Sequence, residues 1–207
     1  MVLKASSKRW LRRHVTDHYV KQARDQGYRS RSAFKLLEID EKDRLLKPGI
    51  RVIDLGAAPG GWSQVAARKV LPGGRVVAVD LLDIAPISGV TSVKGDFREA
   101  AVRARLIEAL EREKADVVLS DLSPNISGIR SADQARAAEL LRAAVDFCRE
   151  SLNPRGVLLV KVFQGEAFSD LLAELKGAFV TVQTRKPGAS RGESSEVYLL
   201  ARGLRED

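Results

Sequence analysis

Short apolar runs alternate along the chain with longer amphipathic stretches. Runs rich in Val, Leu and Ile that are bounded by Gly, Pro or Asp are typical of buried parallel strands. They predict strands at residues 51–55, 75–80, 90–94, 116–121, 156–162, 179–183 and 196–201. Apolar positions at helical spacing predict helices at 32–43, 61–70, 98–114, 131–152 and 167–177. In the helix at 131–152, Ser131 and Gln134 have the spacing of a capping box.

The order of these elements predicts the fold class. Strands that alternate with helices indicate an α/β protein with a doubly wound parallel sheet. A loop rich in Pro, Gly and Ser, rather than a helix, separates the last two strands, which favours an antiparallel final strand. We therefore expect a Rossmann-like fold with a mostly parallel seven-stranded sheet and an antiparallel last strand.

Positive charge is concentrated at the start of the chain. The net charge is +8, and residues 1–35 contain ten Lys or Arg against two Asp, so the remainder is neutral overall. Trp10, Tyr19 and Tyr28 are interleaved with these cations. Cations bind nucleic-acid phosphates and flat rings stack on unpaired bases. The pattern predicts a basic RNA-binding arm at residues 1–30 ahead of a domain at 31–207, and a tail that only aids solubility is the alternative.

Size and composition limit the class of protein further. A chain of 207 residues is long enough for one domain with a full hydrophobic core. With one Cys and two His, we expect neither a disulfide within the chain nor a metal site. No apolar stretch approaches the roughly 20 residues that span a bilayer, and the N-terminus does not resemble a signal peptide. We therefore expect a cytoplasmic protein with no membrane partner.

A glycine-rich bend follows the first predicted strand. Residues 54–62 read Asp-Leu-Gly-Ala-Ala-Pro-Gly-Gly-Trp and lead into a helix. Such a bend brings the backbone close to a nucleotide-like ligand. The dinucleotide spacing G-x-G-x-x-G is missing, so we expect a ligand with an adenosine but without a pyrophosphate. S-adenosylmethionine is the leading candidate, and it would make the chain a methyl-transfer enzyme.

Acidic residues follow the predicted strands at the edge where such sheets bind ligands. Asp54, Asp80 and Asp121 each close an apolar run, and Asp96 comes two residues after the third strand. Asp80 lies 24 residues after Gly56, close to the offset at which an acid binds ribose hydroxyls. Each acid could instead be a strand-end cap or a turn former. Together they suit a ligand that carries a positive sulfonium.

Lys161 interrupts an apolar strand. Burying an ammonium is costly unless it is paired, so we expect a partner close by, and Asp121 is the obvious one. The pair could be a structural salt bridge. Alternatively, a desolvated lysine beside another cation can serve as a general base.

Several of these stretches carry a resemblance to a known family. They are residues 28–36, 54–62, 120–128, 161–165, 186–191 and 194–198, in order over almost the whole chain. The sequence resembles the FtsJ-type family of bacterial ribosomal RNA methyltransferases, which modify a uridine 2′-hydroxyl of 23S rRNA. The resemblance implies a class I methyltransferase fold that binds S-adenosylmethionine. Ser123 is a departure, because the family pattern has alanine there.

The family pattern also implies site residues. Its Lys-Asp-Lys-Glu tetrad matches Lys35, Asp121, Lys161 and Glu196. Its cofactor positions match Gly60, Trp62, Asp80, Asp96 and Asp121. Lys161 would accept the proton of the ribose hydroxyl, Lys35 would hold the oxygen, Asp121 would orient Lys161, and Glu196 would balance the lysines. In a competing version Lys161 stays charged and stabilises the forming alkoxide.

The implied partner is 23S rRNA within the 50S subunit, with no obligate protein partner. Methylation of tRNA or of an mRNA cap uses the same tetrad and is an alternative. A non-catalytic RNA-binding or assembly factor would keep the basic arm and lose the chemistry. A nicotinamide-dependent oxidoreductase could share the fold, although the dinucleotide spacing is missing.

Overall fold

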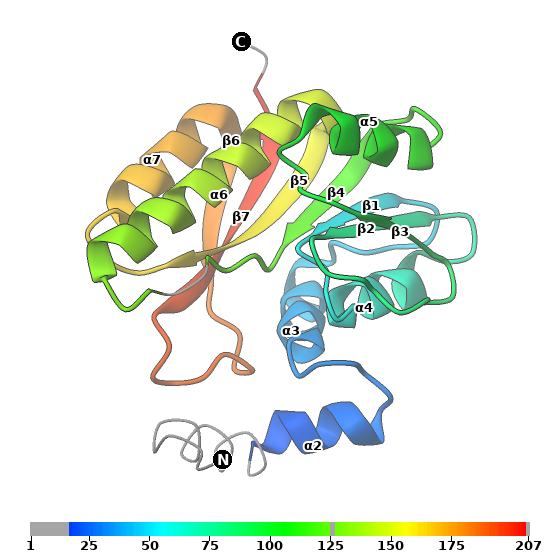
Figure 1. The fold of residues 1–207 in the computed structure, drawn as a ribbon, viewed down its shortest axis with the longest axis horizontal. Coiled ribbons are helices and arrows are strands. Elements are labelled where there is room, and N and C mark those ends of the chain that lie inside the picture. The colour runs from blue at the N-terminus through cyan, green and yellow to red at the C-terminus, as the bar shows by residue number, and fades with distance from the viewer. Residues whose placement is uncertain (1–16, 125–126, 206–207) are drawn as a thin grey trace.

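The computed structural model describes residues 17–124 and 127–205 of the chain (Figure 1). In this part, seven strands form a sheet with the order β3-β2-β1-β4-β5-β7-β6. The strands are β1 Arg51–Leu55, β2 Arg75–Asp80, β3 Val90–Lys94, β4 Ala115–Ser120, β5 Leu152–Phe163, β6 Phe179–Arg185 and β7 Glu196–Leu204. Strands β1 to β5 pair in parallel, whereas β7 is antiparallel to both of its neighbours. The predicted α/β sheet with an antiparallel last strand is confirmed.

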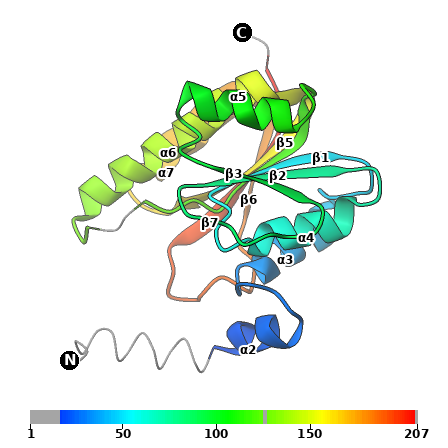
Figure 2. The ribbon, with the colours of Figure 1, turned by 45° about the vertical axis from the view of Figure 1, so that its right-hand side comes forward.

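Helices cover both faces of the sheet. They are α2 His18–Asp25, α3 Ala33–Asp43, α4 Gly61–Val70, α5 Ala100–Ala109, α6 Arg130–Ser151 and α7 Phe168–Ala178. Helices α3 and α4 lie on one face and α5, α6 and α7 on the other, while α2 lies beyond α3 (Figure 2). None of the helices in the described residues is both long and apolar enough to cross a bilayer.

Each central strand contributes to two hydrophobic cores. In β1, Ile53 and Leu55 pack with the core under α5, α6 and α7, whereas Val52 packs with the core under α3 and α4. Successive side chains of a strand point to opposite faces, so a sheet covered on both faces needs apolar residues at every position. This explains why the central strands appear as continuous apolar runs. It also makes Asp54, which is 1% exposed, an exception that needs a reason.

Two predicted boundaries differ from the structure by four residues or more. Strand β5 begins at Leu152 rather than at 156, because Leu152 pairs with Ala115 ahead of a bulge in the strand. Helix α5 ends at Ala109, well before the predicted residue 114. Glu111 and Arg112 adopt positive φ angles of 59° and 62°, which end the helix.

The predicted capping box at Ser131 is wrong. Helix α6 begins at Arg130, and its N-cap residue Ile129 makes no side-chain capping bond. Instead the carboxylate of Asp133 accepts hydrogen bonds from the backbone N–H groups of Ser127 and Gly128, at 2.8 and 3.1 Å. A carboxylate in the first turn that ties back the preceding loop therefore holds this end of the helix.

Helix α3 is fastened to the last two strands at both of its ends. Near its start, Lys35 forms an ion pair with Glu196 at the beginning of β7. At its end, the carboxylate of Asp43 accepts two hydrogen bonds from Arg185 of β6, at 2.7 and 2.6 Å. The guanidinium of Arg202 in β7 also donates to the carbonyl oxygen of Asp43 at 3.0 Å. The helix is therefore held to β6 and β7 near both of its ends.

We predict that Asp43→Asn lowers the free energy of unfolding by about 1–3 kcal/mol at pH 7. Hydrogen bonds from Arg185 hold the pKa of Asp43 below its usual value, although burial opposes them. Because the folded pKa is depressed, the stabilisation is present above the unfolded pKa of about 3.9 and is lost as the pH falls through the folded value. Urea unfolding followed by circular dichroism at several pH values measures this dependence.

Glu41→Gln on the same helix is the matched control, because Glu41 is exposed. If both variants lost the same stability at pH 7, the Asp43 bridge would contribute nothing specific.

Candidate active site

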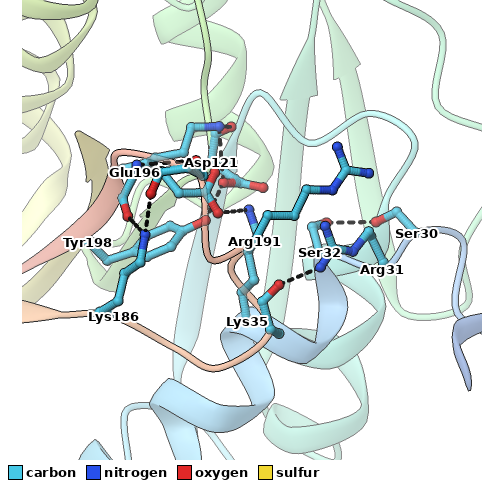
Figure 3. Close-up of polar contacts among 12 residues, drawn as sticks. Ser30, Arg31, Ser32, Lys35, Asp121, Lys186, Arg191, Glu196 and Tyr198 are labelled. Atoms are coloured by element: carbon cyan, nitrogen blue, oxygen red, sulfur yellow. Dashed lines mark hydrogen bonds and ion pairs between the residues drawn. The ribbon is translucent and has the colours of Figure 1, made fainter. Parts of the chain in front are cut away.

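The four predicted catalytic residues meet at the carboxyl ends of β4 and β5. Figure 3 shows three of them, Lys35, Asp121 and Glu196. The four residues form two ion pairs. Lys35 Nζ lies 2.6 Å from Glu196 Oε1, and Lys161 Nζ lies 3.2 Å from Asp121 Oδ1. Lys161 also donates a hydrogen bond to the carbonyl oxygen of Asp121, at 2.7 Å. The predicted pairing of Lys161 with Asp121 is confirmed.

Tyr198 joins the two pairs, and the sequence analysis did not predict a role for it. Its hydroxyl donates to Asp121 Oδ1 at 2.7 Å, and its ring centroid lies 5.7 Å from Lys35 Nζ. The antiparallel register places Tyr198 opposite Lys161. Side chains two residues apart on a strand share a face, so Tyr198 faces the same side as Glu196. This two-residue spacing from Glu196 is the signal that could have identified it.

The cluster is buried and electrically balanced. The side chains of Lys35 and Glu196 are 9% and 12% exposed, and those of Lys161 and Asp121 are 7% and 18% exposed. Charged groups tolerate such burial only when they are paired. Burial acts to raise the pKa of Glu196, but the hydrogen bond and charge of Lys35 and the charge of Lys161 outweigh it and hold the pKa low. Glu196 is therefore a carboxylate at neutral pH.

The pKa of the Tyr198 hydroxyl is raised by its burial and by the charge of Asp121. It therefore stays protonated and acts as a hydrogen-bond donor to that carboxylate. Tyr198 fixes the oxygen that Lys161 also contacts.

A cleft of about 890 Å³ opens beside this cluster. Its charged lining residues are three cations, Arg31, Lys35 and Arg191, and three acids, Asp17, Glu193 and Glu196. Arg31 fixes one wall, because it donates to the carbonyl oxygen of Ala189 at 2.6 Å and pairs with Asp17 at 3.2 Å. On the loop before β7, Lys186 donates to the carbonyl oxygens of Ser194 and Glu196. The cleft has room for a nucleotide, and its cations suit a phosphate.

The glycine-rich bend lies between β1 and α4. Gly56 and Gly60 have φ angles of 74° and 108°, which side chains rarely adopt. A Cβ on Gly60 would also meet Ile87 Cδ1 at 2.5 Å. The bend therefore needs these glycines for its own shape, and it leaves the N–H groups at the start of α4 available to a ligand.

Trp62 does not present its side chain to that ligand. The indole is 2% exposed, donates to the carbonyl oxygen of Ser32 at 2.8 Å and packs on Tyr198 with 5.6 Å between ring centroids. A cofactor contact at this position would therefore use the main chain of Trp62. Its side chain instead connects the bend to Tyr198 and the two ion pairs.

Two of the predicted cofactor acids, Asp80 and Asp96, form hydrogen bonds with neighbouring protein groups. Asp80 accepts hydrogen bonds from the backbone N–H groups of Ala58 and Leu82, at 2.9 and 2.8 Å. Asp96 forms hydrogen bonds with Arg98 Nε at 2.9 and 3.0 Å. These bonds lower the pKa of Asp96 against the opposing effect of burial, so it is ionised. A carboxylate oxygen has two lone pairs, so both acids can still accept a hydrogen bond from a ligand.

Asp54 shows that the site suits a positive ligand. Its Oδ2 accepts a 2.6 Å hydrogen bond from Ser63, but its buried Oδ1 has no partner among the described residues. Burial raises the pKa of Asp54 to about 7, and the charges of Asp121 and Asp80 add to this effect against the Ser63 bond. A cation nearby would favour the ionised form. The residues present thus fit the sulfonium and amino group of S-adenosylmethionine. Among the described residues, no three His, Cys, Asp or Glu side chains form a metal-binding group.

Comparison with known proteins also indicates a methyltransferase. The family model of FtsJ-like methyltransferases matches residues 28–204. A "Ribosomal RNA large subunit methyltransferase E" of Nitrosospira multiformis is 56% identical over 97% of this chain and 98% of its own length. The protein of the same name from Chromohalobacter salexigens is 54% identical over 96% of this chain and 95% of its own length.

Two solved structures are similar to this chain in fold. A Plasmodium falciparum structure described as a ribosomal RNA methyltransferase has a TM-score of 0.76 and 30% identity, covering 86% of this chain and 98% of that one. A Clostridium thermocellum structure described as an rRNA methylase, at 18% identity and a TM-score of 0.55, covers 83% of this chain and 97% of that one and shares the fold. On the family model and these relatives, the chain belongs to the FtsJ-like methyltransferase family.

Proposed function

We propose that the chain transfers a methyl group from S-adenosylmethionine to the 2′-hydroxyl of a uridine in 23S rRNA. The observation that carries this proposal is the paired cluster of Lys35, Glu196, Lys161 and Asp121 between an acidic sheet edge and a cleft wide enough for a nucleotide. Relatives at 56% and 54% identity are ribosomal RNA large subunit methyltransferases, which supports a ribosomal substrate. We propose the 50S subunit as its context and the cytoplasm as its place of action.

The donor would bind at the acidic edge. Asp80 would accept hydrogen bonds from the ribose hydroxyls, Asp96 from the adenine amino group, and Asp54 and Asp121 would face the positive end. Gly60 and the main chain of Trp62 would lie against the donor at the start of α4, where N–H groups favour a carboxylate. Bound there, the donor supplies a methyl carbon attached to a positive sulfur.

The acceptor ribose would enter the cleft beside Lys35 and Glu196. A ribose hydroxyl is a weak nucleophile near neutral pH, so its proton must be removed as the oxygen attacks. In the proposed step, Lys161 first gives up its ammonium proton to solvent and reacts as the neutral amine. The O–C bond then forms as the C–S bond breaks in line, and the hydroxyl proton passes to Lys161 Nζ. Asp121 would hold Lys161 in place, and Lys35 would stabilise the negative charge that develops on the oxygen.

In an alternative version of this step Lys161 remains protonated and acts by its charge and position. The predicted arm at residues 1–30 would bind RNA phosphates in both versions. Residues 1–16 of that arm lie outside the described residues. The described remainder includes α2, where Tyr19 donates to Glu38 of α3 at 3.0 Å, so this segment is attached beside the cleft.

We predict that Lys161→Ala lowers kcat for methyl transfer by about 10²- to 10⁴-fold, the usual contribution of a proton-transfer group. Binding of S-adenosylmethionine, measured by calorimetry, should survive, because the donor contacts lie on other strands. Transfer of a tritiated methyl group to 23S rRNA measures the rate. Lys176→Ala, at an exposed position of α7, is the control. Normal turnover in the Lys161 variant would refute its role.

We predict that Tyr198→Phe lowers kcat by about 10- to 100-fold, because Asp121 loses a charge-assisted hydrogen bond. The KM for RNA should stay close to the native value, since the Tyr198 side chain is buried behind the cleft. Steady-state kinetics with a rRNA transcript separate the two constants. A variant with native kcat would show that the hydroxyl does not position Asp121 for the reaction.

A further inference from the structure

A second pocket, of about 570 Å³, lies at the amino-terminal ends of β4 and β5, opposite the active site. Its walls come from the loop after α3, from β4, β5 and from β7. Four cationic side chains line it: Arg44, Lys47, Arg155 and Arg202. Residues 36–207 are neutral overall, so four cations around one pocket are a local excess.

These cations are largely free to bind an anion. Within the described part of the chain, Arg44, Lys47 and Arg155 form no side-chain hydrogen bond or ion pair, and all three are exposed. The acid in the lining is Asp116, which stands against the four cations. Its oxygens accept hydrogen bonds from the backbone N–H of Arg51 and from Asn153 Nδ2, each at 2.8 Å.

The wall that carries Arg155 has a fixed shape. Strand β4 pairs with β5 at Ala115–Leu152 and again at Val117–Val157, so residues 153–156 bulge outward opposite a single residue. The Asn153 bond to Asp116 holds the bulge. A Cβ on Gly156 would lie 2.5 Å from Leu152 Cδ1 and 2.8 Å from Asn153 O, so the bulge has room only for glycine there. Bulges of this kind redirect side chains, here that of Arg155 toward the pocket.

Helix α3 connects this pocket to the catalytic cluster. Lys35 belongs to that cluster, and Arg44, the C-cap residue of α3, lines the pocket. Nine residues of helix separate the two Cα atoms by about 14 Å. That is roughly four phosphates along one strand of a duplex at about 3.4 Å each. An RNA that lay along α3 with one ribose in the cleft would bring a phosphate of a nearby nucleotide to the pocket.

We propose that this pocket binds a backbone phosphate of the RNA substrate, away from the methylated ribose. The inference rests on the proposed function, because that function supplies the RNA. Guanidinium and ammonium groups on three separate elements suit a phosphodiester, and the fixed bulge orders one of them in advance. A free phosphate or a mononucleotide presents the same chemistry, so the test must separate these sources.

The test is a double variant, Lys47→Gln with Arg155→Gln, at exposed positions of the pocket rim. Its control is Arg105→Gln with Lys176→Gln, which removes two positive charges from exposed positions on α5 and α7. Binding of a 23S rRNA transcript is measured over a range of salt concentrations. In the pocket variant we expect the slope of log K against log salt to fall by about 1–2, and the affinity at about 0.1 M salt to fall several-fold. The control should retain the native slope.

Equal slopes in the pocket variant, the control and the native chain would overturn the proposal. So would tight saturation of the pocket by AMP or inorganic phosphate alone, followed by NMR, with RNA binding unaffected in the variant. Calorimetric donor binding and circular dichroism should match the native chain, which shows that the variant is folded. RNA binding is measured without methyl transfer. A native chain that binds through the pocket but fails to methylate ribose would refute only the proposed function.

Discussion

The structure around the active site depends on burying two lysines and two carboxylates next to one another. An isolated ammonium in this position would cost several kcal/mol or more, so neither Lys35 nor Lys161 could stay charged there without its acid. The pairs Lys35–Glu196 and Lys161–Asp121 meet this requirement. They also impose conditions on the fold, because the four residues come from four separate elements that must meet at one edge of the sheet.

The antiparallel last strand satisfies those conditions. Because β7 runs opposite to β5, it begins at the carboxyl edge of the parallel strands and places Glu196 and Tyr198 beside Lys161. Helix α3 delivers Lys35 from the other side and is anchored at its far end by Asp43 and its arginine partners. The position of Lys35 therefore depends on bonds at the other end of the helix.

The two sides of the site differ in charge. Carboxylates at the ends of β1, β2 and β4 gather on the side where we propose that a positive donor binds, whereas the cleft on the other side is lined by cations and acids in equal number. On the donor side, the buried Oδ1 of Asp54 has no hydrogen-bond partner among the described residues.

Much of this was predictable from the sequence, because apolar runs and strand-end acids are local signals. The seven strands and the partnership of Lys161 with Asp121 follow from such signals. Features that depend on contacts between distant segments were not predictable. The indole of Trp62 donates a hydrogen bond to the carbonyl oxygen of Ser32, 30 residues away. The end of α5 depends on two residues with positive φ. Tyr198 could have been identified only by applying the two-residue strand period to Glu196.

The central claim is that this cluster directs a methyl group to a ribose oxygen of 23S rRNA. The most direct test maps 2′-O-methyl groups and base methyl groups on rRNA from cells with and without this protein. We predict that one uridine in 23S rRNA loses its 2′-O-methyl group and that base methylation is unchanged. An unaltered 2′-O-methyl pattern, or the loss of a base methyl group instead, would contradict the account.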